Sequence, residues 1–149
     1  MKKVQLLLLG LLIFACSKAE TTPEEPEPTS FLEKYDRTVW NNPEIATIGF
    51  VDDVTQFLWT IGTDCSAIGE GSSTEDGNTA SIRINTNTPE EFIYTLAGNI
   101  GESDFVIVRT YTVTNNTLTE EITITFNGDQ ETINNSYNKF SGEVADYCS

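Results

Sequence analysis

Histidine is missing from this 149-residue sequence, which removes the commonest general base and the commonest protein ligand of transition metals. Basic side chains are also few: 8 lysines and arginines stand against 23 aspartates and glutamates, and the formal net charge is −15. Binding to nucleic acid needs clustered positive charge, so this balance argues against a nucleic-acid-binding protein. The length allows one ordinary domain, and the hydrophobic content of 38% is too high for a wholly disordered chain.

The N-terminus carries an apolar segment that is too short to cross a membrane. Two lysines precede the stretch from Val4 to Phe14, which is apolar almost throughout. At about 1.5 Å per residue this stretch makes roughly 16 Å of helix, whereas a bilayer core is about 30 Å thick. The segment therefore indicates a secretory signal peptide, which we place at residues 1–15.

The end of this segment resembles the lipobox of bacterial lipoproteins. In Ile13-Phe14-Ala15-Cys16 a small residue precedes a cysteine, and in that family the cysteine receives lipid and becomes the new N-terminus. The resemblance implies that Cys16 is lipidated and that acyl chains hold the protein at the membrane. Ser17 is not the aspartate that retains enterobacterial lipoproteins in the inner membrane, so the implied location is the outer membrane of a Bacteroidetes-type envelope. Whether the protein faces the periplasm or the cell surface stays open at this point.

Residues 16–30 predict an extended tether behind the lipid. From Ser17 to Ser30 the sequence alternates proline with glutamate and contains nothing to bury. Such a chain repels itself and makes no helix or strand hydrogen bonds, so it favours an extended spacer. At about 3.1 Å per residue it holds the domain up to roughly 40 Å from the lipid.

Beyond the tether the sequence predicts one domain, residues 31–149, built almost entirely from β-strands. A short helical turn over residues 31–35 opens it, with Ser30 as the N-cap and Glu33 completing a capping box. Thr, Val, Ile, Phe and Tyr then recur in short runs that turn residues separate. The runs cover residues 37–41, 45–51, 57–61, 79–85, 91–97, 104–114, 118–126, 130–134 and 139–147.

Alternation within these runs predicts which side chains face the core. The run over 118–126 places one charged residue, Glu120, on an otherwise apolar face with Leu118, Ile122, Ile124 and Phe126. Ile82 and Ile84 alternate with polar neighbours and are also expected to point inward. A third set of inward side chains, less cleanly alternating, consists of Phe57, Trp59 and Ile61.

The turns between the runs favour an antiparallel meander of about eight to ten strands. Asn127-Gly128 lies between two runs and is a strong signal for a type I′ hairpin, since both residues tolerate positive φ. Strands with one apolar face have to bury that face away from water. The sheet does so either by closing into a barrel or by folding into a β-sandwich.

The order of these elements resembles that of small lipocalin-like lipoproteins. An early helical turn leads into a first strand that carries Trp40, in the segment Phe31-Leu-Glu-Lys-Tyr-Asp-Arg-Thr-Val-Trp40, and the meander ends near Cys148. The resemblance implies that residues 31–149 form a lipocalin-like barrel. It also implies a cup that holds a small apolar ligand.

Cys65 and Cys148 are the two thiols left once Cys16 carries lipid. An exported protein passes through an oxidising compartment, so we expect these two residues to form a disulfide. Such a bond would join the last strand to the early part of the sheet. Unpaired structural cysteines are the alternative, whereas a catalytic thiol would need a base, which is usually histidine.

Carboxylates occur as adjacent pairs at Asp52-Asp53, Glu75-Asp76, Glu90-Glu91 and Glu120-Glu121. Neighbours on a strand point to opposite faces, so no pair makes a catalytic dyad by itself. Oxygen-rich turns suit Ca²⁺, but none of these has EF-hand spacing. We therefore expect solubilising surface charge, with no metal, no cofactor and no enzymatic activity. Two strand arginines, Arg83 and Arg109, are expected to pair with local carboxylates, the alternative being contact with an acidic ligand.

Aromatic side chains are the best candidates for ligand contact. The predicted set comprises Phe57, Trp59, Tyr94 and Tyr111, with Trp59 pointing into the barrel. In a domain of this size most large aromatics simply form the core, which is the competing interpretation. Two functions follow: a lipid-anchored module that binds a small apolar ligand, or an envelope protein-interaction module whose barrel is filled by side chains. A cavity of a few hundred Å³ would separate them.

Overall fold

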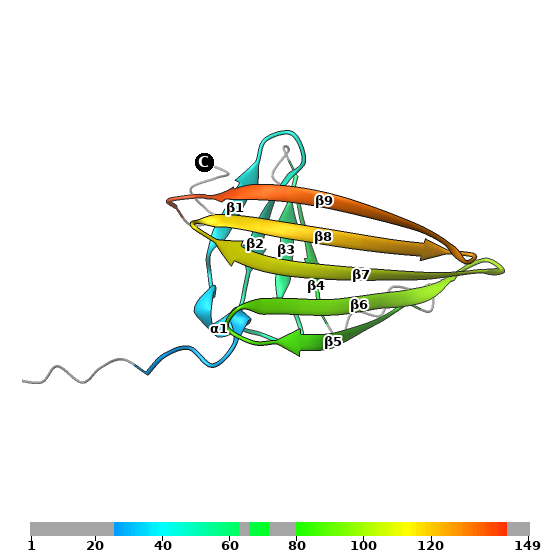
Figure 1. Cartoon of the computed structure of the whole chain (residues 1–149), viewed down its shortest axis with the longest axis horizontal. Helices are drawn as coiled ribbons and strands as arrows, with labels where there is room; N and C mark the ends of the chain where they lie inside the picture. The colour runs from blue at the N-terminus through cyan, green and yellow to red at the C-terminus, as the bar shows by residue number, and fades with distance from the viewer. Residues whose placement is uncertain (1–25, 63–65, 72–79, 143–149) are drawn as a thin grey trace, which may run out of the picture.

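The computed structural model describes residues 26–62, 66–71 and 80–142, which form one short helix and nine strands (Figure 1). The expected all-β fold with a short N-terminal helical turn is confirmed. Among the described residues, no helix is long and apolar enough to cross a membrane. In chain order the elements are α1 (Phe31–Lys34), β1 (Val39–Asn42), β2 (Ala46–Phe50), β3 (Leu58–Ile61), β4 (Ala67–Glu70), β5 (Ser81–Asn87), β6 (Glu91–Ile100), β7 (Ser103–Thr114), β8 (Thr117–Phe126) and β9 (Asp129–Lys139).

All nine strands belong to one antiparallel sheet, in the order β4-β3-β2-β1-β9-β8-β7-β6-β5. The chain runs as two meanders, β1–β4 and β5–β9, and the pairing of β1 with β9 joins them. Figure 1 shows this sheet curled, so that β1–β4 lie behind β5–β9. The described residues show no pairing between the edge strands β4 and β5. The fold is therefore barrel-like, as expected, but it is a curled half-barrel made from one sheet and open along one side.

The helical turn forms at the expected place and has the expected cap. The hydroxyl of Ser30 accepts a hydrogen bond from the backbone N–H of Glu33 at 3.1 Å. The carboxylate of Glu33 accepts from the N–H and the hydroxyl of Thr29, at 2.6 and 2.9 Å, one residue earlier than a capping box implies. Phe31 and Leu32 are fully buried, so α1 covers one end of the half-barrel (Figure 1).

Asparagine and glycine make the long hairpins. Asn127 and Gly128 have φ angles of 51° and 90° between β8 and β9, which confirms the expected hairpin. Asn115 and Asn116, with φ of 50° and 62°, connect β7 to β8 in the same way. These tight turns fix the register of the three strands that they join.

The strands differ most from the expected runs at β4 and at the C-terminal end of the sheet. β4 was not expected, because four residues beside glycine give a weak signal. β9 continues to Lys139, five residues beyond the run over 130–134. Of the run over 139–147, residues 140–142 lie in no strand, and the remainder lies outside the described residues.

Three predictions concern parts of the chain outside the described residues. They are the signal peptide over 1–15, the lipidation of Cys16, and the disulfide between Cys65 and Cys148. All three stay predictions. Of the tether, only residues 26–30 are described.

The end of the half-barrel near α1 is filled by aromatic rings. The ring centroid of Phe92 lies 5.0 Å from that of Phe57, 6.0 Å from that of Phe31 and 6.4 Å from that of Tyr111. Fully burying one such side chain stabilises a fold by about 1.5–3 kcal/mol, so this cluster dominates the core. The whole cluster comprises Phe31, Leu32, Trp40, Ile48, Phe50, Phe57, Leu58, Phe92, Tyr94, Tyr111, Leu118 and Tyr137.

Strands β6–β9 are much longer than β1–β4. They have ten to twelve residues, against four or five. At about 3.3 Å per residue the long strands span roughly 35 Å and the short ones roughly 15 Å. Figure 1 shows the consequence: β6–β9 continue past β1–β4 on the side away from α1. We call this projecting part, residues 96–107 and 122–133, the distal sheet.

Candidate functional site

A buried polar cluster adjoins the aromatic core and is centred on Glu120 of β8. Glu120 is a charged residue on an otherwise apolar strand face, and its side chain is buried, with 2% exposed. Its Oε1 accepts a hydrogen bond from the hydroxyl of Tyr111 at 2.7 Å. Its Oε2 accepts from the hydroxyl of Tyr137 at 2.8 Å and from the side-chain amide of Asn135 at 2.9 Å. Three donors thus offset the cost of burying a carboxylate.

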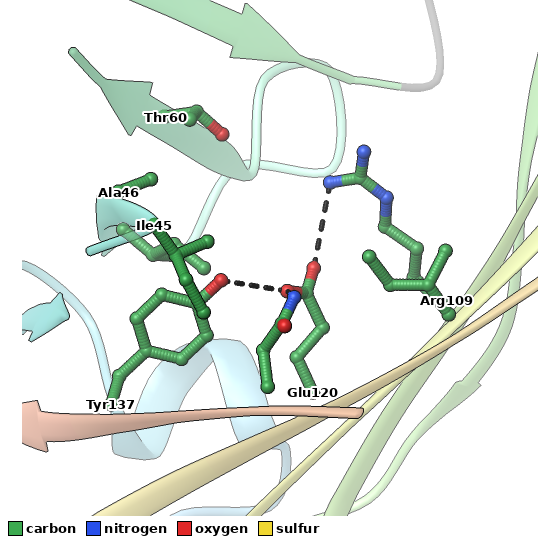
Figure 2. Close-up of a pocket in the computed structure, with 9 residues that line it drawn as sticks. Ile45, Ala46, Thr60, Arg109, Glu120 and Tyr137 are labelled. Carbon is green, nitrogen blue, oxygen red and sulfur yellow. Dashed lines mark hydrogen bonds and ion pairs between the residues drawn. The ribbon is translucent and has the colours of Figure 1, made fainter. Parts of the chain in front are cut away.

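Arg109 of β7 connects this cluster to strand β4 across the interior. Its Nη1 lies 3.6 Å from Oε1 of Glu120 and 3.5 Å from Oε1 of Glu70 (Figure 2 shows the first pair). The hydroxyl of Tyr94 donates a hydrogen bond to Oε2 of Glu70. The expectation that a strand arginine pairs with local carboxylates is therefore confirmed for Arg109. One guanidinium thus lies between two carboxyl groups from opposite walls of the half-barrel.

Burial holds the tyrosines of this cluster in their neutral form. It is the main reason that the pKa of Tyr111 and that of Tyr94 lie well above the ordinary value. Glu120 raises the pKa of Tyr111 further, and Glu70 does so for Tyr94, where Arg109 acts in the opposite direction. Burial and Glu120 also raise the pKa of Tyr137. All three hydroxyls therefore stay protonated hydrogen-bond donors at neutral pH.

Arg109 also keeps its protonation state, since its guanidinium stays positively charged at neutral pH. Burial acts to lower the pKa of its guanidinium, but Tyr94, Tyr111 and Glu70 outweigh burial, and the pKa lies above its ordinary value. The cluster is thus a fixed network of one guanidinium, two carboxylates and three neutral hydroxyls. The described buried side-chain N and O atoms all have a hydrogen-bond partner, so none is left over for a substrate or ligand. This is typical of a network that stabilises the fold.

A half-open pocket of about 160 Å³ lies beside the cluster, where β2 and β3 face β7–β9 (Figure 2). Binding sites for drug-sized ligands measure about 300–1,000 Å³, and an apolar cavity of about 150 Å³ holds benzene. The pocket therefore has room for one small group and not for a whole lipid. Its wall is apolar at Ile45, Ala46, Ile48 and Ile122, and polar at Thr60, Arg109, Glu120, Asn135 and Tyr137.

A second hollow, of about 340 Å³, lies where the tether meets α1 and the turn before β6. Its lining contains both signs of charge and two prolines: Glu27, Pro28, Lys34, Pro89 and Glu90. Most of these side chains are exposed, and no buried polar group points into it. It is the junction between spacer and domain rather than a built site.

Three of the four residues expected to contact a ligand lie in the core. Phe57, Tyr94 and Tyr111 are at most 1% exposed. The ring centroids of Phe57 and Tyr94 are 4.9 Å apart, and those of Tyr94 and Tyr111 are 6.2 Å apart. These side chains pack against one another, as the competing core interpretation holds.

The fourth residue, Trp59, lies on the opposite face of β3. Leu58 belongs to the core and Thr60 lines the pocket, and neighbouring strand residues point to opposite sides. Trp59 therefore faces outward, where it is partly buried. The expected inward set of Phe57, Trp59 and Ile61 is corrected, because β3 begins at Leu58 and Phe57 reaches the core from the preceding loop.

The inner side of the distal sheet carries an apolar surface. Cross-strand pairing sets the inward side chains of β6, β7 and β8 in rows, and β9 adds one more apolar residue. Phe126 is 43% exposed and Ile133 is 37% exposed, which is high for such residues on a concave face. None of these residues belongs to the core cluster. We call this set the distal face: Leu96, Phe105, Ile107, Ile124, Phe126 and Ile133.

No other element of the described chain covers the distal face. Strands β1–β4, which cover the inner side near α1, end before they reach it (Figure 1). The outer side of the distal sheet is more polar and carries Thr123, Thr125 and Thr132. Contiguous exposed apolar surface with a polar surround is typical of interaction sites.

Charge on the distal sheet has one sign. Residues 96–107 and 122–133 contain no lysine or arginine. Two carboxylates lie on the inner side, since Glu131 pairs with Ile124 and Asp129 pairs with Phe126. Glu102 and Asp104 lie at the β6–β7 hairpin. The distal face is thus an apolar surface with an acidic border.

No known protein family, curated protein or solved structure matches this chain. Within the described ranges, no group of three or more Asp, Glu or Cys side chains could hold a metal ion. The candidate features are therefore the saturated polar cluster, the small pocket beside it, and the distal face.

The sequence signalled some of these features and not others. Glu120 and Arg109 are charged residues within otherwise apolar strand patterns. The expectation that the pair Glu120-Glu121 is solubilising surface charge is wrong for Glu120, which is buried because its side chain points to the inner face of β8. Glu70 and Asn135 had no such signal, because their role depends on the curl of the sheet. Ile124 and Phe126 were expected to face the core, but alternation alone does not reveal that β1–β4 stop short of them.

Proposed function

We propose that this chain is a lipid-anchored protein of the bacterial outer membrane whose β domain is a protein-interaction module and not an enzyme. The observation that carries the proposal is the distal face, an apolar sheet surface that the described residues leave uncovered. Such a surface costs free energy in water unless a partner covers it.

The shape of this surface favours a macromolecular partner over a small ligand. Sites for small molecules bury about 70–90% of the ligand surface, which requires walls on several sides. The part of the half-barrel with walls on both sides is occupied by the aromatic core and by the Glu120 cluster. In the part of the chain that the structure describes, the distal face has one wall. Its occupant therefore has to bring a second side of its own, as a protein segment does.

The N-terminal signals support the location that we propose. Residues 1–15 and Cys16 fit a lipoprotein signal with an acylated cysteine, and the Pro/Glu-rich spacer would hold the domain up to about 40 Å from the lipid. The net charge of −15 disfavours contact of the domain with anionic lipid headgroups. The domain is then free to meet another envelope protein.

Site-specific photocrosslinking in cells tests the interaction. A photoreactive residue replaces either Phe126 of the distal face or Val106, which is 38% exposed on the outer side of the same sheet. We expect a cross-link to one defined protein from position 126 and none from position 106. Equal cross-linking from both positions, or none from position 126, would overturn the proposal.

Labelling with a palmitate analogue tests the anchor. We expect label on the wild-type chain, and neither label nor membrane association for Cys16→Ser. A labelled or membrane-bound variant would refute anchoring through Cys16.

The small pocket favours a second candidate function, the binding of an apolar small molecule. A ligand could insert one end beside Arg109 and Ile122 and lay the rest along the distal face. Native mass spectrometry of the gently extracted protein separates the two functions. This candidate is supported if an apolar compound co-purifies with the wild-type protein and is lost in the Ile122→Asp variant. If no compound co-purifies, the protein-interaction module is the remaining function.

A further inference from the structure

The border of the distal face distinguishes between kinds of partner. Asp129 and Glu131 precede Ile133 along β9 on the same side of the strand, so carboxylates flank the apolar side chains on the inner side itself. The hairpin with Glu102 and Asp104 adds negative charge at the far end. The distal sheet contains no basic residue to compensate for them.

This charge argues against a second copy of the chain as the occupant. In a two-fold dimer the same patch meets itself, so the carboxylates of both copies would share one interface in which the distal sheet supplies no basic residue to pair with them. Like charges across an interface cost free energy and slow association. An anionic lipid surface is disfavoured for the same reason.

Building on the proposed function, we propose that the distal face binds a segment of another protein that presents apolar side chains flanked by lysine or arginine. The apolar side chains would bury Phe126 and Ile133 together with the four half-buried residues of the face. The cations would meet Glu131 and Asp129. Apolar burial then supplies most of the affinity, and the charged border supplies specificity and a fast association rate.

Peptide binding to the full-length lipoprotein tests the proposal. The protein is placed in nanodiscs of phosphatidylcholine, and the probe is a fluorescent peptide in which valine and lysine alternate. One control peptide carries glutamate in place of lysine, and another carries serine in place of valine. We expect saturable binding of the Val/Lys peptide, at least about tenfold tighter than either control, measured by fluorescence anisotropy.

Matched variants locate the binding surface. Phe126→Ser should weaken binding of the Val/Lys peptide by about tenfold, and Val106→Ser on the outer side by less than about twofold. Glu131→Gln should weaken it about threefold at low salt, and added salt should remove that difference. The exposed outward carboxylate Glu121 provides the control, as Glu121→Gln should have no such effect.

The outcomes separate this inference from the proposed function. Equal binding of the Val/Lys and Ser/Lys peptides overturns the inference, as does equal loss in the Phe126 and Val106 variants. If a defined protein still cross-links at position 126, the interaction function stands and only the partner chemistry is wrong. Cross-linking of position 126 to a second copy of the chain also overturns the inference.

Discussion

At the scale of single residues, the interior depends most on Glu120. Its carboxylate is almost fully buried and receives hydrogen bonds from Tyr111, Tyr137 and Asn135, with Arg109 nearby. A carboxylate can accept from all of these donors at once. A neutral side chain of the same shape cannot, because an amide turns N–H groups toward some of them.

Glu120→Gln should therefore destabilise the fold by about 3 kcal/mol. The variant loses the charge opposite Arg109 and places an amide N–H against at least one tyrosine hydroxyl. Urea unfolding followed by circular dichroism measures the change. The control is Glu121→Gln, whose exposed side chain points outward and should cost less than about 0.5 kcal/mol. Equal stability of the two variants would contradict the role given to Glu120.

The buried tyrosines should make the fold sensitive to alkaline pH. The pKa of Tyr94 and that of Tyr111 are raised in the folded state, mainly by burial. In the unfolded chain a tyrosine ionises near pH 10, so above that pH the unfolded state releases protons that the folded state keeps. The stabilising contribution is complete below about pH 10. Above it, the free energy of unfolding should fall by about 1.4 kcal/mol per pH unit for each tyrosine.

Tyr111→Phe provides the test of that pH dependence. The variant removes one titrating group, so its stability should decline less steeply above about pH 10 than that of the wild type. Urea unfolding at a series of alkaline pH values gives both slopes. Parallel slopes would show that Tyr111 does not contribute.

At the scale of elements, the hairpins are what local sequence determines best. Asn127-Gly128 and Asn115-Asn116 adopt positive φ at both turn positions and fix the pairing of β7, β8 and β9. Because the β7–β8 turn is tight, Tyr111 lies directly opposite Glu120. That part of the polar cluster follows from the order of residues alone.

Gly128→Ala should destabilise the domain by about 1 kcal/mol. Gly128 has φ of 90°, and an added Cβ would meet nothing within 4 Å among the described residues, so the cost is backbone strain alone. Gly128→Asn should cost less, since asparagine tolerates positive φ better than alanine does. Urea unfolding of the two variants gives the order, and a reversed order would contradict a strained turn.

Local sequence patterns do not predict three other features: strand β4, the face of β3, and the pairing of β1 with β9. β4 is four residues long, and its place beside β3 depends on long-range pairing. Alternation that starts at Phe57 predicts the wrong face for Trp59, because Phe57 belongs to the loop before Leu58 and not to β3. The pairing of β1 with β9 brings together segments almost a hundred residues apart, and only the folded sheet establishes it.

At the scale of the whole molecule, the half-barrel has two edge strands, β4 and β5, and a side-chain network holds one of them in place. Among the described strands, β4 pairs with β3 alone. Across the interior, Glu70 at its end pairs with Arg109 of β7 and accepts a hydrogen bond from Tyr94 of β6. These side-chain contacts hold the edge strand β4 against β6 and β7. The described residues show no backbone pairing that would do so.

Glu70→Gln should therefore loosen β4 without unfolding the rest of the sheet. The variant loses the charge that faces Arg109, while β8 and β9 keep their full ladders. Hydrogen exchange followed by mass spectrometry should show the amides of Ala67–Glu70 exchanging about tenfold faster, with little change in β8. Tyr94→Phe removes the hydrogen bond but keeps the ion pair, so it should have a smaller effect on β4. Equal acceleration in β4 and β8 would mean that Glu70 stabilises the whole domain rather than its edge strand β4.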